Sequence, residues 1–443
     1  MKQRILIVVL SILPSMGGIG GSLLFAQNGV NSPYSRYGFG MMADRAMGFN
    51  KAMGGVAQGF RDGQQINVSN PASYSAVDSL TALFDLGLSV FNGNYKMGNM
   101  QQNAKNASFD YFAFQFRLRR GLGVTLGILP YTNISYKFNS ASSTISGSET
   151  ITSTNTFTGS GGLHQVFLGA GWQPLPGLSV GANVSYLYGD YNHTSANTFS
   201  ESSAFSMQRS YTADIATYKL DFGMQLTLPL SKQDDITLGA TYGLGHDIKS
   251  QAIRTTQTRN SSAVNASGDT LSNAFQLPHS IDVGITWRHA QKWRIGADFA
   301  LEKWANVRFP SDISGTYTSS KGHLNDRMKI SLGGEYTPDA YGRKLLQYTS
   351  YRFGGWYSQT YARTNATDKP YEFGLTAGFS FPIKNRHVWY NSPRLNIALQ
   401  WVHSEIPFLS SQTNQKNTLT ENYLRLSVGL TFSERWFTKW RVQ

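Results

Sequence analysis

From about Leu80 to the end of the chain, apolar residues alternate with polar or small ones, and this alternation restricts the possible folds more than any other feature of the sequence. Successive side chains of a β-strand point to opposite faces, so a strand with one apolar side shows a period of two. In the segment 372–381 one face is apolar: Phe373, Leu375, Ala377, Phe379 and Phe381. The segments 292–301 and 423–432 show the same pattern, so we expect a long series of strands.

The alternation predicts fourteen strands, most of them ten or more residues long. They lie near 80–96, 108–119, 121–138, 162–173, 177–193, 209–229, 234–252, 275–290, 292–308, 326–338, 350–362, 370–383, 393–404 and 421–433. Strands of soluble proteins are usually shorter, whereas tilted membrane strands need about this length. The strand lengths therefore favour a membrane protein.

The predicted connections fall into two classes. Short ones, such as 119–121 and 289–291, alternate with long Ser/Thr/Asn-rich ones, such as 140–160 and 257–273. This alternation is typical of outer-membrane barrels, and closure of an even number of strands satisfies every backbone hydrogen bond within the sheet. We predict an all-β fold, a fourteen-stranded antiparallel transmembrane β-barrel in the bacterial outer membrane. A large soluble β-sandwich is the competing interpretation.

Composition agrees with an exported barrel. The chain has no cysteine, which excludes disulfides, thiolate metal sites and cysteine nucleophiles. Only 15% of its residues are charged, while Gly, Tyr and Phe are abundant. The formal charge of +13 is scattered along the sequence, so membrane lipids and lipopolysaccharide phosphates are more suitable partners than nucleic acid.

The first 26 residues have the features of a secretory signal peptide. Lys2 and Arg4 precede an apolar run over 5–13, and small residues follow, with a cleavage site after Ala26. We therefore divide the chain into a signal peptide (1–26), an N-terminal segment (27–79), a barrel (80–433) and a basic, amphipathic periplasmic C-terminal tail (434–443).

The segment 27–79 lacks alternation and is rich in glycine. The lumen of a fourteen-stranded barrel is wider than its own side chains can fill, and glycine permits close backbone approach to a wall. We expect this segment to form a plug, or hatch, inside the barrel. The alternative is a periplasmic tail packed outside it.

Several motifs resemble the FadL/TodX family of outer-membrane transporters for long-chain fatty acids and other hydrophobic compounds. AMGGVAQGFRDGQQINVSNPASYS (52–75) resembles the hatch of that family, with its Asn-Pro-Ala element at Asn70, Pro71 and Ala72. LPHSIDVGITWR (277–288) and KWRIGADFALEKWANV (292–307) resemble two of its later paired strands. The C-terminal tail and NSPYSRYGFG (31–40) have no counterpart that we can assign.

This resemblance implies a hatch-plugged barrel in which a hydrophobic substrate binds near the hatch and leaves sideways through the wall at a kinked third strand. The residues that it assigns to the hatch and the substrate path are Gly54, Gly55, Asn67, Asn70, Pro71 and Ala72.

Pro130 interrupts the predicted third strand, GLGVTLGILPYTNISYKF. Because proline has no N–H for the ladder, it does not belong in a regular central strand. We expect Pro130 to mark the kink of a lateral gate. The alternative is that it sits at a strand end.

No residue pattern indicates catalysis. The eight histidines stand singly, no serine occupies a nucleophile elbow, and GFGMMADRAMG lacks the Lys-Ser/Thr of a phosphate loop. We therefore predict no enzymatic activity, no catalytic or metal-binding residues and no cofactor; a barrel enzyme, with its site assembled from several strands, is our third interpretation.

The leading interpretation is a passive outer-membrane channel for hydrophobic compounds, such as long-chain fatty acids, gated by the hatch. The alternative is an accessory barrel subunit of a larger outer-membrane complex for protein insertion or secretion, whose partners are other outer-membrane proteins. A continuous hydrophobic cavity would favour transport, and a filled lumen would favour the subunit role.

Overall fold

A computed structural model describes residues 31–146, 149–201, 204–260, 263–313, 315–364, 369–383, 393–409 and 416–435. The predicted signal peptide and most of the predicted C-terminal tail lie outside the described residues. None of the helices in this part of the chain has the length and apolarity of a membrane-spanning helix.

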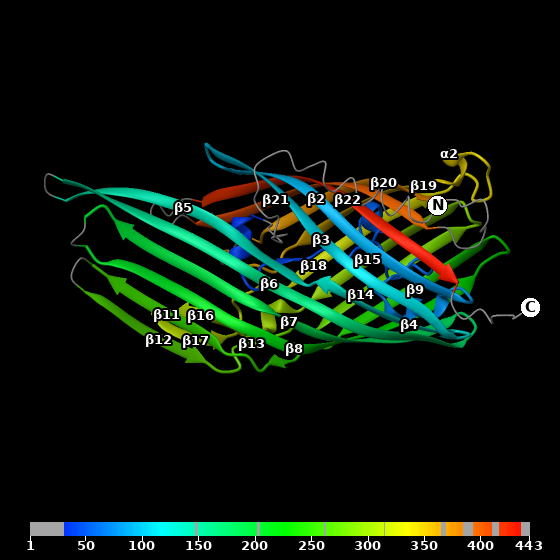
Figure 1. The fold of residues 1–443 in the computed structure, drawn as a ribbon, viewed down its shortest axis with the longest axis horizontal. Helices are drawn as coiled ribbons and strands as arrows, with labels where there is room; N and C mark the ends of the chain where they lie inside the picture. The colour runs from blue at the N-terminus through cyan, green and yellow to red at the C-terminus, as the bar shows by residue number, and fades with distance from the viewer. Residues whose placement is uncertain are drawn as a thin grey trace, which may run out of the picture.

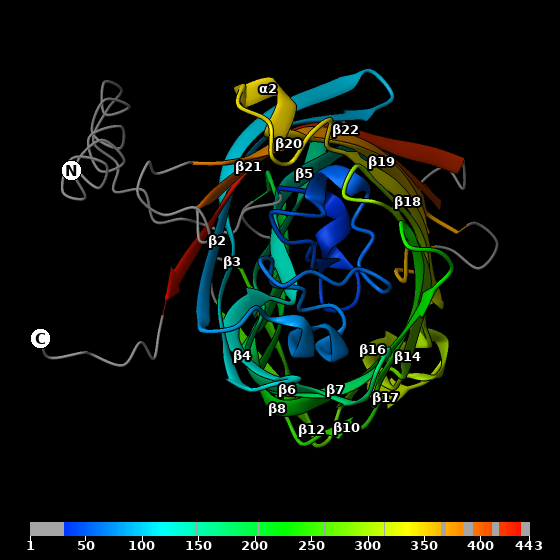
Figure 2. The ribbon, with the colours of Figure 1, turned by 90° about the vertical axis from the view of Figure 1, so that its right-hand side faces the viewer.

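Fourteen strands pair in one closed antiparallel ring, which confirms the predicted barrel (Figures 1 and 2). In ring order they are β2 (Thr81–Met97), β3 (Met100–Arg119), β4 (Leu122–Pro130), β6 (Glu149–Leu175), β7 (Leu178–Phe199), β8 (Ser206–Pro229), β9 (Asp234–Gly243), β14 (Ser280–His289), β15 (Trp293–Glu302), β18 (Arg327–Tyr336), β19 (Ser350–Gln359), β20 (Tyr371–Pro382), β21 (Arg394–Leu409) and β22 (Lys416–Arg435). The ring closes where β22 pairs with β2, from Thr81↔Arg435 to Met97↔Leu419.

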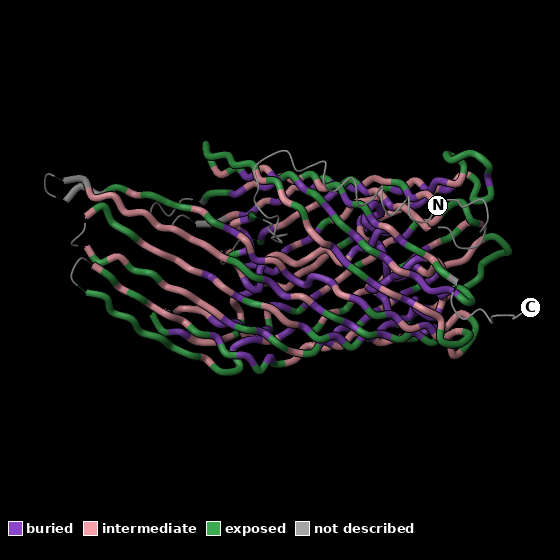
Figure 3. Tube along the Cα trace, viewed as in Figure 1, coloured by how far each residue is buried: buried purple, intermediate pink, exposed green. Residues whose placement is uncertain are grey.

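The apolar residues of the alternating pattern form the outer surface of the barrel, and the polar or small residues form its inner surface. On β22, Leu424, Leu426 and Val428 are exposed, whereas Ser427 and Thr431 between and beyond them are buried. Other strands repeat this arrangement, so buried residues alternate with exposed or partly buried ones along the strands (Figure 3). An apolar exterior is what a barrel surrounded by lipid requires.

The two ends of the barrel differ. One end, which we call the short-turn end, carries the tight connections β3–β4, β6–β7, β8–β9 and β14–β15. The start of β2 and the end of β22 also lie there. It also carries the longer β18–β19 connection, which contains α2 (Leu345–Tyr348). The other end, the long-loop end, carries further short strands: β10 (Asp247–Ile248), β11 (Ala252–Arg259), β12 (Val264–Leu271), β13 (Phe275–Gln276), β16 (Phe309–Ile313) and β17 (Thr316–Ser320).

The prediction of long polar loops was wrong for the segments 140–160 and 257–273. In the first segment, β5 (Thr132–Ser146) pairs with β6 up to Ser146↔Glu149. In the second, β11 pairs with β12 from Ala252↔Leu271 to Arg259↔Val264. The Ser and Asn content suggested loops, but Thr, Ile and Val in these segments suit strands, and cross-strand pairs stabilise such hairpins.

The N-terminal segment lies within the ring of strands (Figure 2). It contains η2 (Pro33–Arg36), β1 (Met41–Met42), η3 (Lys51–Met53) and η4 (Pro71–Ala76). η3 contacts β18 to β21, and η4 contacts β4, β6, β7 and β8 on the other side. Wall glycines permit this approach, since a Cβ at Gly223 would overlap with the side chain of Asn70.

Candidate functional site

The Asn-Pro-Ala element forms the start of a short helix inside the barrel. Asn70 caps η4, because its side-chain oxygen accepts a hydrogen bond from the N–H of Ala72 at 3.1 Å, and Pro71 occupies the first turn. The Asn70 amide also donates to the carbonyl of Met224 on β8 at 3.2 Å. The turn-forming residues before the first barrel strand therefore attach the N-terminal segment to the wall.

The other predicted residues also shape this segment. Asn67 donates to the carbonyls of Ala57 and Phe60, at 2.7 and 3.0 Å, and so folds the segment on itself. Gly54 and Gly55 both have positive φ, 64° and 83°, which favours glycine. Residues of the predicted hatch thus come together in the lumen.

Wall side chains hold the backbone of the N-terminal segment at several points. One carboxylate oxygen of Asp298 on β15 accepts hydrogen bonds from the N–H groups of Ala57 and Gln58, at 2.6 and 3.0 Å. Gln225 on β8 donates to the carbonyls of Gln58 and Phe60, at 2.9 and 3.1 Å. Because buried backbone groups need partners, the wall and the segment satisfy one another.

Ion pairs join the same two parts. Lys51 on η3 pairs with Asp110 on β3, and both side chains are buried. Asp62 pairs with Arg294 on β15 at 3.3 Å. Removing one partner of such a pair would leave an uncompensated buried charge, which costs about 3–5 kcal/mol.

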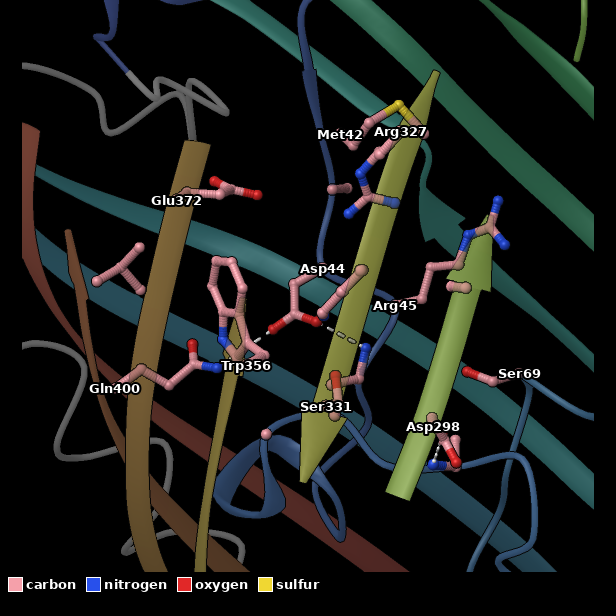
Figure 4. Close-up of a pocket in the computed structure, with 18 of the residues that line it drawn as sticks. Met42, Asp44, Arg45, Ser69, Asp298, Arg327, Ser331, Trp356, Glu372 and Gln400 are labelled. Atoms are coloured by element: carbon pink, nitrogen blue, oxygen red, sulfur yellow. Dashed lines mark hydrogen bonds between the residues drawn. The ribbon is translucent and has the colours of Figure 1, made fainter. Parts of the chain in front are cut away.

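A small, charged cavity lies between the N-terminal segment and the wall. Its volume is about 170 Å³, and Figure 4 shows Asp44 at its centre. The charged side chains that line it come from the N-terminal segment and from many wall strands: Asp44, Arg45, Asp110, Asp282, Asp298, Glu302, Arg327, Lys329, Glu372 and Arg425. It therefore differs from the apolar pocket expected for a hydrophobic substrate.

Asp44 and Arg45 are adjacent residues with different surroundings. Burial opposes ionisation of Asp44, but the positive charges of Lys51, Lys329 and Arg425 hold the pKa of its carboxyl below the ordinary value. Gln400 donates to Asp44 at 3.5 Å, and Arg425 lies 3.9 Å from it. Burial likewise opposes the charge of Arg45, but the phenol of Tyr131 and then the carboxylate of Glu302 raise the pKa of this guanidinium.

The barrel wall is interrupted at its third strand. Pairing between β3 and β4 stops at Phe112↔Ile128, while β4 continues along β6 to Pro130↔His164. β5 then starts at Thr132 and pairs with β6 and β1, so the described residues give β3 no partner there on its second side. Pro130 is the last residue of β4, at the edge of this wall gap.

The N-terminal segment covers the wall gap from inside. β1 pairs with β5 through Met41↔Asn133 and Met42↔Thr132. Further along, Ser35 accepts a hydrogen bond from the N–H of Ser135 at 3.2 Å. A molecule leaving the lumen through the gap would first have to displace these residues.

The whole chain, residues 1–443, matches the BamG family. The chain belongs to this family. No curated protein matches it. Solved structures share its fold, among them the Pseudomonas putida toluene transporter TodX (16% identity, TM-score 0.54, covering 87% of this chain and 97% of that one).

Two further structures are similar to this BamG-family chain. A Pseudomonas aeruginosa FadL homologue shares 12% identity, with a TM-score of 0.58, over 87% of this chain and 98% of its own. The Ralstonia pickettii toluene transporter TbuX shares 17% identity, with a TM-score of 0.54, over 86% and 97%. These structures confirm that the chain shares the barrel fold of the FadL/TodX family, as its sequence motifs predicted.

Sequence reasoning did not identify the charged residues of the wall as part of the site. Asp298 and Arg294 lie on the polar face of β15, where apolar and polar residues alternate. On β19, the buried Arg352 donates a hydrogen bond to Glu335 of β18 at 2.6 Å. Charges on the inner face of a predicted barrel strand were the available signal. Among the described residues, no group of three or more His, Asp or Glu is placed to hold a metal ion.

Proposed function

We propose that this BamG-family barrel is an accessory subunit of a larger outer-membrane complex for protein insertion or secretion. The observation that carries the proposal is the filled lumen. The N-terminal segment is bonded to strands around the ring, and the cavity around Asp44 that remains beside it measures about 170 Å³ and is lined by charges.

A hydrophobic compound would be poorly accommodated in this cavity. Small-molecule sites typically measure about 300–1,000 Å³ and are mostly apolar. An apolar molecule beside Arg327, Lys329 and Glu372 would remove polar neighbours or water from these groups without replacing their hydrogen bonds. A closed barrel can instead act through its outer surface and its connections, as a subunit does.

Passive uptake of hydrophobic compounds, including long-chain fatty acids, is the second candidate. The fold and the wall gap beside Pro130 favour it. In this candidate the N-terminal segment acts as a hatch, moves away from the cavity and the gap, and lets the substrate leave sideways. The outward side chains beside the gap, such as Lys105 and Lys137, are exposed and polar, which suits water better than acyl chains.

One disulfide separates the two candidates. Met41 and Asn133 are direct cross-strand partners, and the chain has no cysteine of its own, so Met41→Cys with Asn133→Cys would lock the N-terminal segment onto the gap. The matched control, Thr258→Cys with Asn265→Cys, would cross-link β11 to β12, outside the N-terminal segment.

The subunit role predicts that the locked protein still copurifies with its outer-membrane partners and that outer-membrane protein levels in cells stay normal. Labelled fatty acid or toluene uptake should be equal with and without a reductant. Uptake that disappears on oxidation of the Met41/Asn133 variant alone, and returns on reduction, would instead establish the channel.

A further inference from the structure

The β18–β19 connection departs from the other described turns at the short-turn end. It spans 337–349 and contains α2, whereas the β3–β4, β6–β7, β8–β9 and β14–β15 connections are tight. Tyr341, Leu345 and Leu346 on it are 75%, 52% and 70% exposed. Large apolar side chains in water are unfavourable unless another surface covers them.

The connection is a built structure. The N–H of Asp339 donates to the carbonyl of Gln347 at 2.8 Å, and the N–H of Thr349 donates to the carbonyl of Leu345 at 3.1 Å. The carboxylate of Asp339 accepts a hydrogen bond from the N–H of Tyr341 at 3.0 Å. These bonds fix the shape that presents the apolar side chains.

The connection lies beside the lipid-facing surface. Arg352 on β19 is buried inside the ring, so its neighbours Tyr351 and Phe353 point outward, and Phe353 is 64% exposed. The Tyr351 hydroxyl donates to the carbonyl of Leu346 at 3.3 Å. Figure 2 shows α2 outside the ring, next to β20.

The charges of the connection match a phospholipid surface. Arg343 and Lys344 are exposed beside the two leucines, and the one acidic residue, Asp339, is engaged by the N–H of Tyr341. Tyrosine, leucine and basic residues together are typical of segments at the boundary between lipid headgroups and acyl chains. Anionic headgroups attract basic residues at this depth.

We propose that the β18–β19 connection is an interfacial membrane anchor: Leu345 and Leu346 insert among the acyl chains at the short-turn end, while Arg343 and Lys344 bind lipid phosphates. This anchor is independent of the subunit role, because it needs only lipid.

The test uses the purified full chain with one cysteine, Leu346→Cys, carrying a polarity-sensitive fluorophore, in vesicles of phosphatidylethanolamine and phosphatidylglycerol. Two labelled controls bracket the result: Lys232→Cys in the exposed β8–β9 turn, and Leu332→Cys on the outer face of β18, where Leu332 is 61% exposed. A heat-dependent gel shift establishes that each variant is folded.

We expect emission at position 346 to be blue-shifted and to be quenched by nitroxide-labelled lipid as strongly as at position 332. Replacing Arg343 and Lys344 by Gln should weaken the quenching at position 346 in anionic vesicles. Emission like that of position 232 in these vesicles would overturn the anchor. If position 346 were also protected from labelling in native envelopes, the surface would belong to a protein partner.

Discussion

Two adjacent glycines of the N-terminal segment provide a sensitive test of how tightly it is enclosed. Gly54 and Gly55 both have positive φ, so alanine at either position costs about 1–2 kcal/mol of backbone strain. A Cβ at Gly54 would lie 2.6 Å from the carbonyl oxygen of Gly355, whereas a Cβ at Gly55 would meet nothing closer than the amine of Lys329 at 3.5 Å.

We therefore expect Gly54→Ala to destabilise the barrel by about 1–3 kcal/mol more than Gly55→Ala, since the wall backbone cannot give way. The measurement is the temperature at which the folded band disappears on gels. Equal temperatures for the two variants would contradict close packing of the segment against β18 and β19.

Asp44 links stability to pH. Neighbouring positive charges lower the pKa of Asp44 in the folded state. Ionised Asp44 therefore stabilises the fold above the pKa of an unfolded aspartate, and this stabilisation is lost as the pH falls through the lower pKa of the folded state. We expect Asp44→Asn to lower the unfolding temperature at neutral pH and to remove part of the difference between neutral pH and about pH 3.

The control is Asp247→Asn. Asp247 forms an ion pair with Arg308 at 2.7 Å, but its side chain is 54% exposed, so its removal should cost about 0–1 kcal/mol. If Asp44→Asn lowered stability no more than Asp247→Asn does, a structural role for the charged cavity would be refuted.

At the scale of elements, the described part of the long-loop end contains paired hairpins such as β5–β6 and β11–β12. Proteases cut exposed tips with little structure, and paired strands resist them. External protease on intact cells should therefore cleave the β11–β12 hairpin at 260–263 and leave the paired residues of β11 and β12 intact. Mass spectrometry of the released fragments locates the cuts. Cuts spread over the whole of 257–273 would show that the strands of this hairpin are not paired on the cell.

The prediction from sequence succeeded where one physical constraint acted along a whole strand. Lipid outside and a polar lumen inside impose the period of two that located all fourteen strands. It failed at 140–160 and 257–273, because most of the described residues of these hairpins are exposed or only partly buried, so no strict alternation of apolar and polar residues is imposed on them. The break between β4 and β5 was visible as Pro130, since a missing N–H is a local property.

The site was less predictable because its members come from distant parts of the sequence. Asn70 could be recognised as part of a turn, but its contact with Met224 depends on how the ring closes. Likewise, nothing local to Asp110 indicates that Lys51 will be its partner. A polar inner face allows charges at many positions, and only the three-dimensional register selects those that meet.

For the molecule as a whole, the N-terminal segment should decide whether the barrel conducts. Deleting residues 31–75 removes the partners of Asp298, Gln225 and Asp110, so the variant should insert as a less stable barrel with a water-filled lumen. Planar-bilayer recordings should show ion conductance for this variant only. Deleting the outer hairpin 252–271 is the control, and a silent 31–75 deletion that still runs as a folded barrel would exclude the plug.

The closure of the ring on its own N-terminal segment has a consequence for the order of assembly. The segment is bonded to strands on both sides of the lumen, such as β15 and β3, and it is joined to the ring at Thr81, the start of β2. Entering a finished barrel through one of its ends would require the segment to find all these partners within a confined lumen, so we expect it to be in place while the sheet is still open. We then expect the seam between β2 and β22, which joins positions as far apart as Thr81 and Arg435, to form last. Bringing such distant partners together is slow, because loop closure grows costlier with chain length. We therefore expect this chain to pass, during biogenesis, through a stage in which its sheet surrounds the N-terminal segment but the β2–β22 seam is still open. At that stage both seam strands could pair with a strand of another protein.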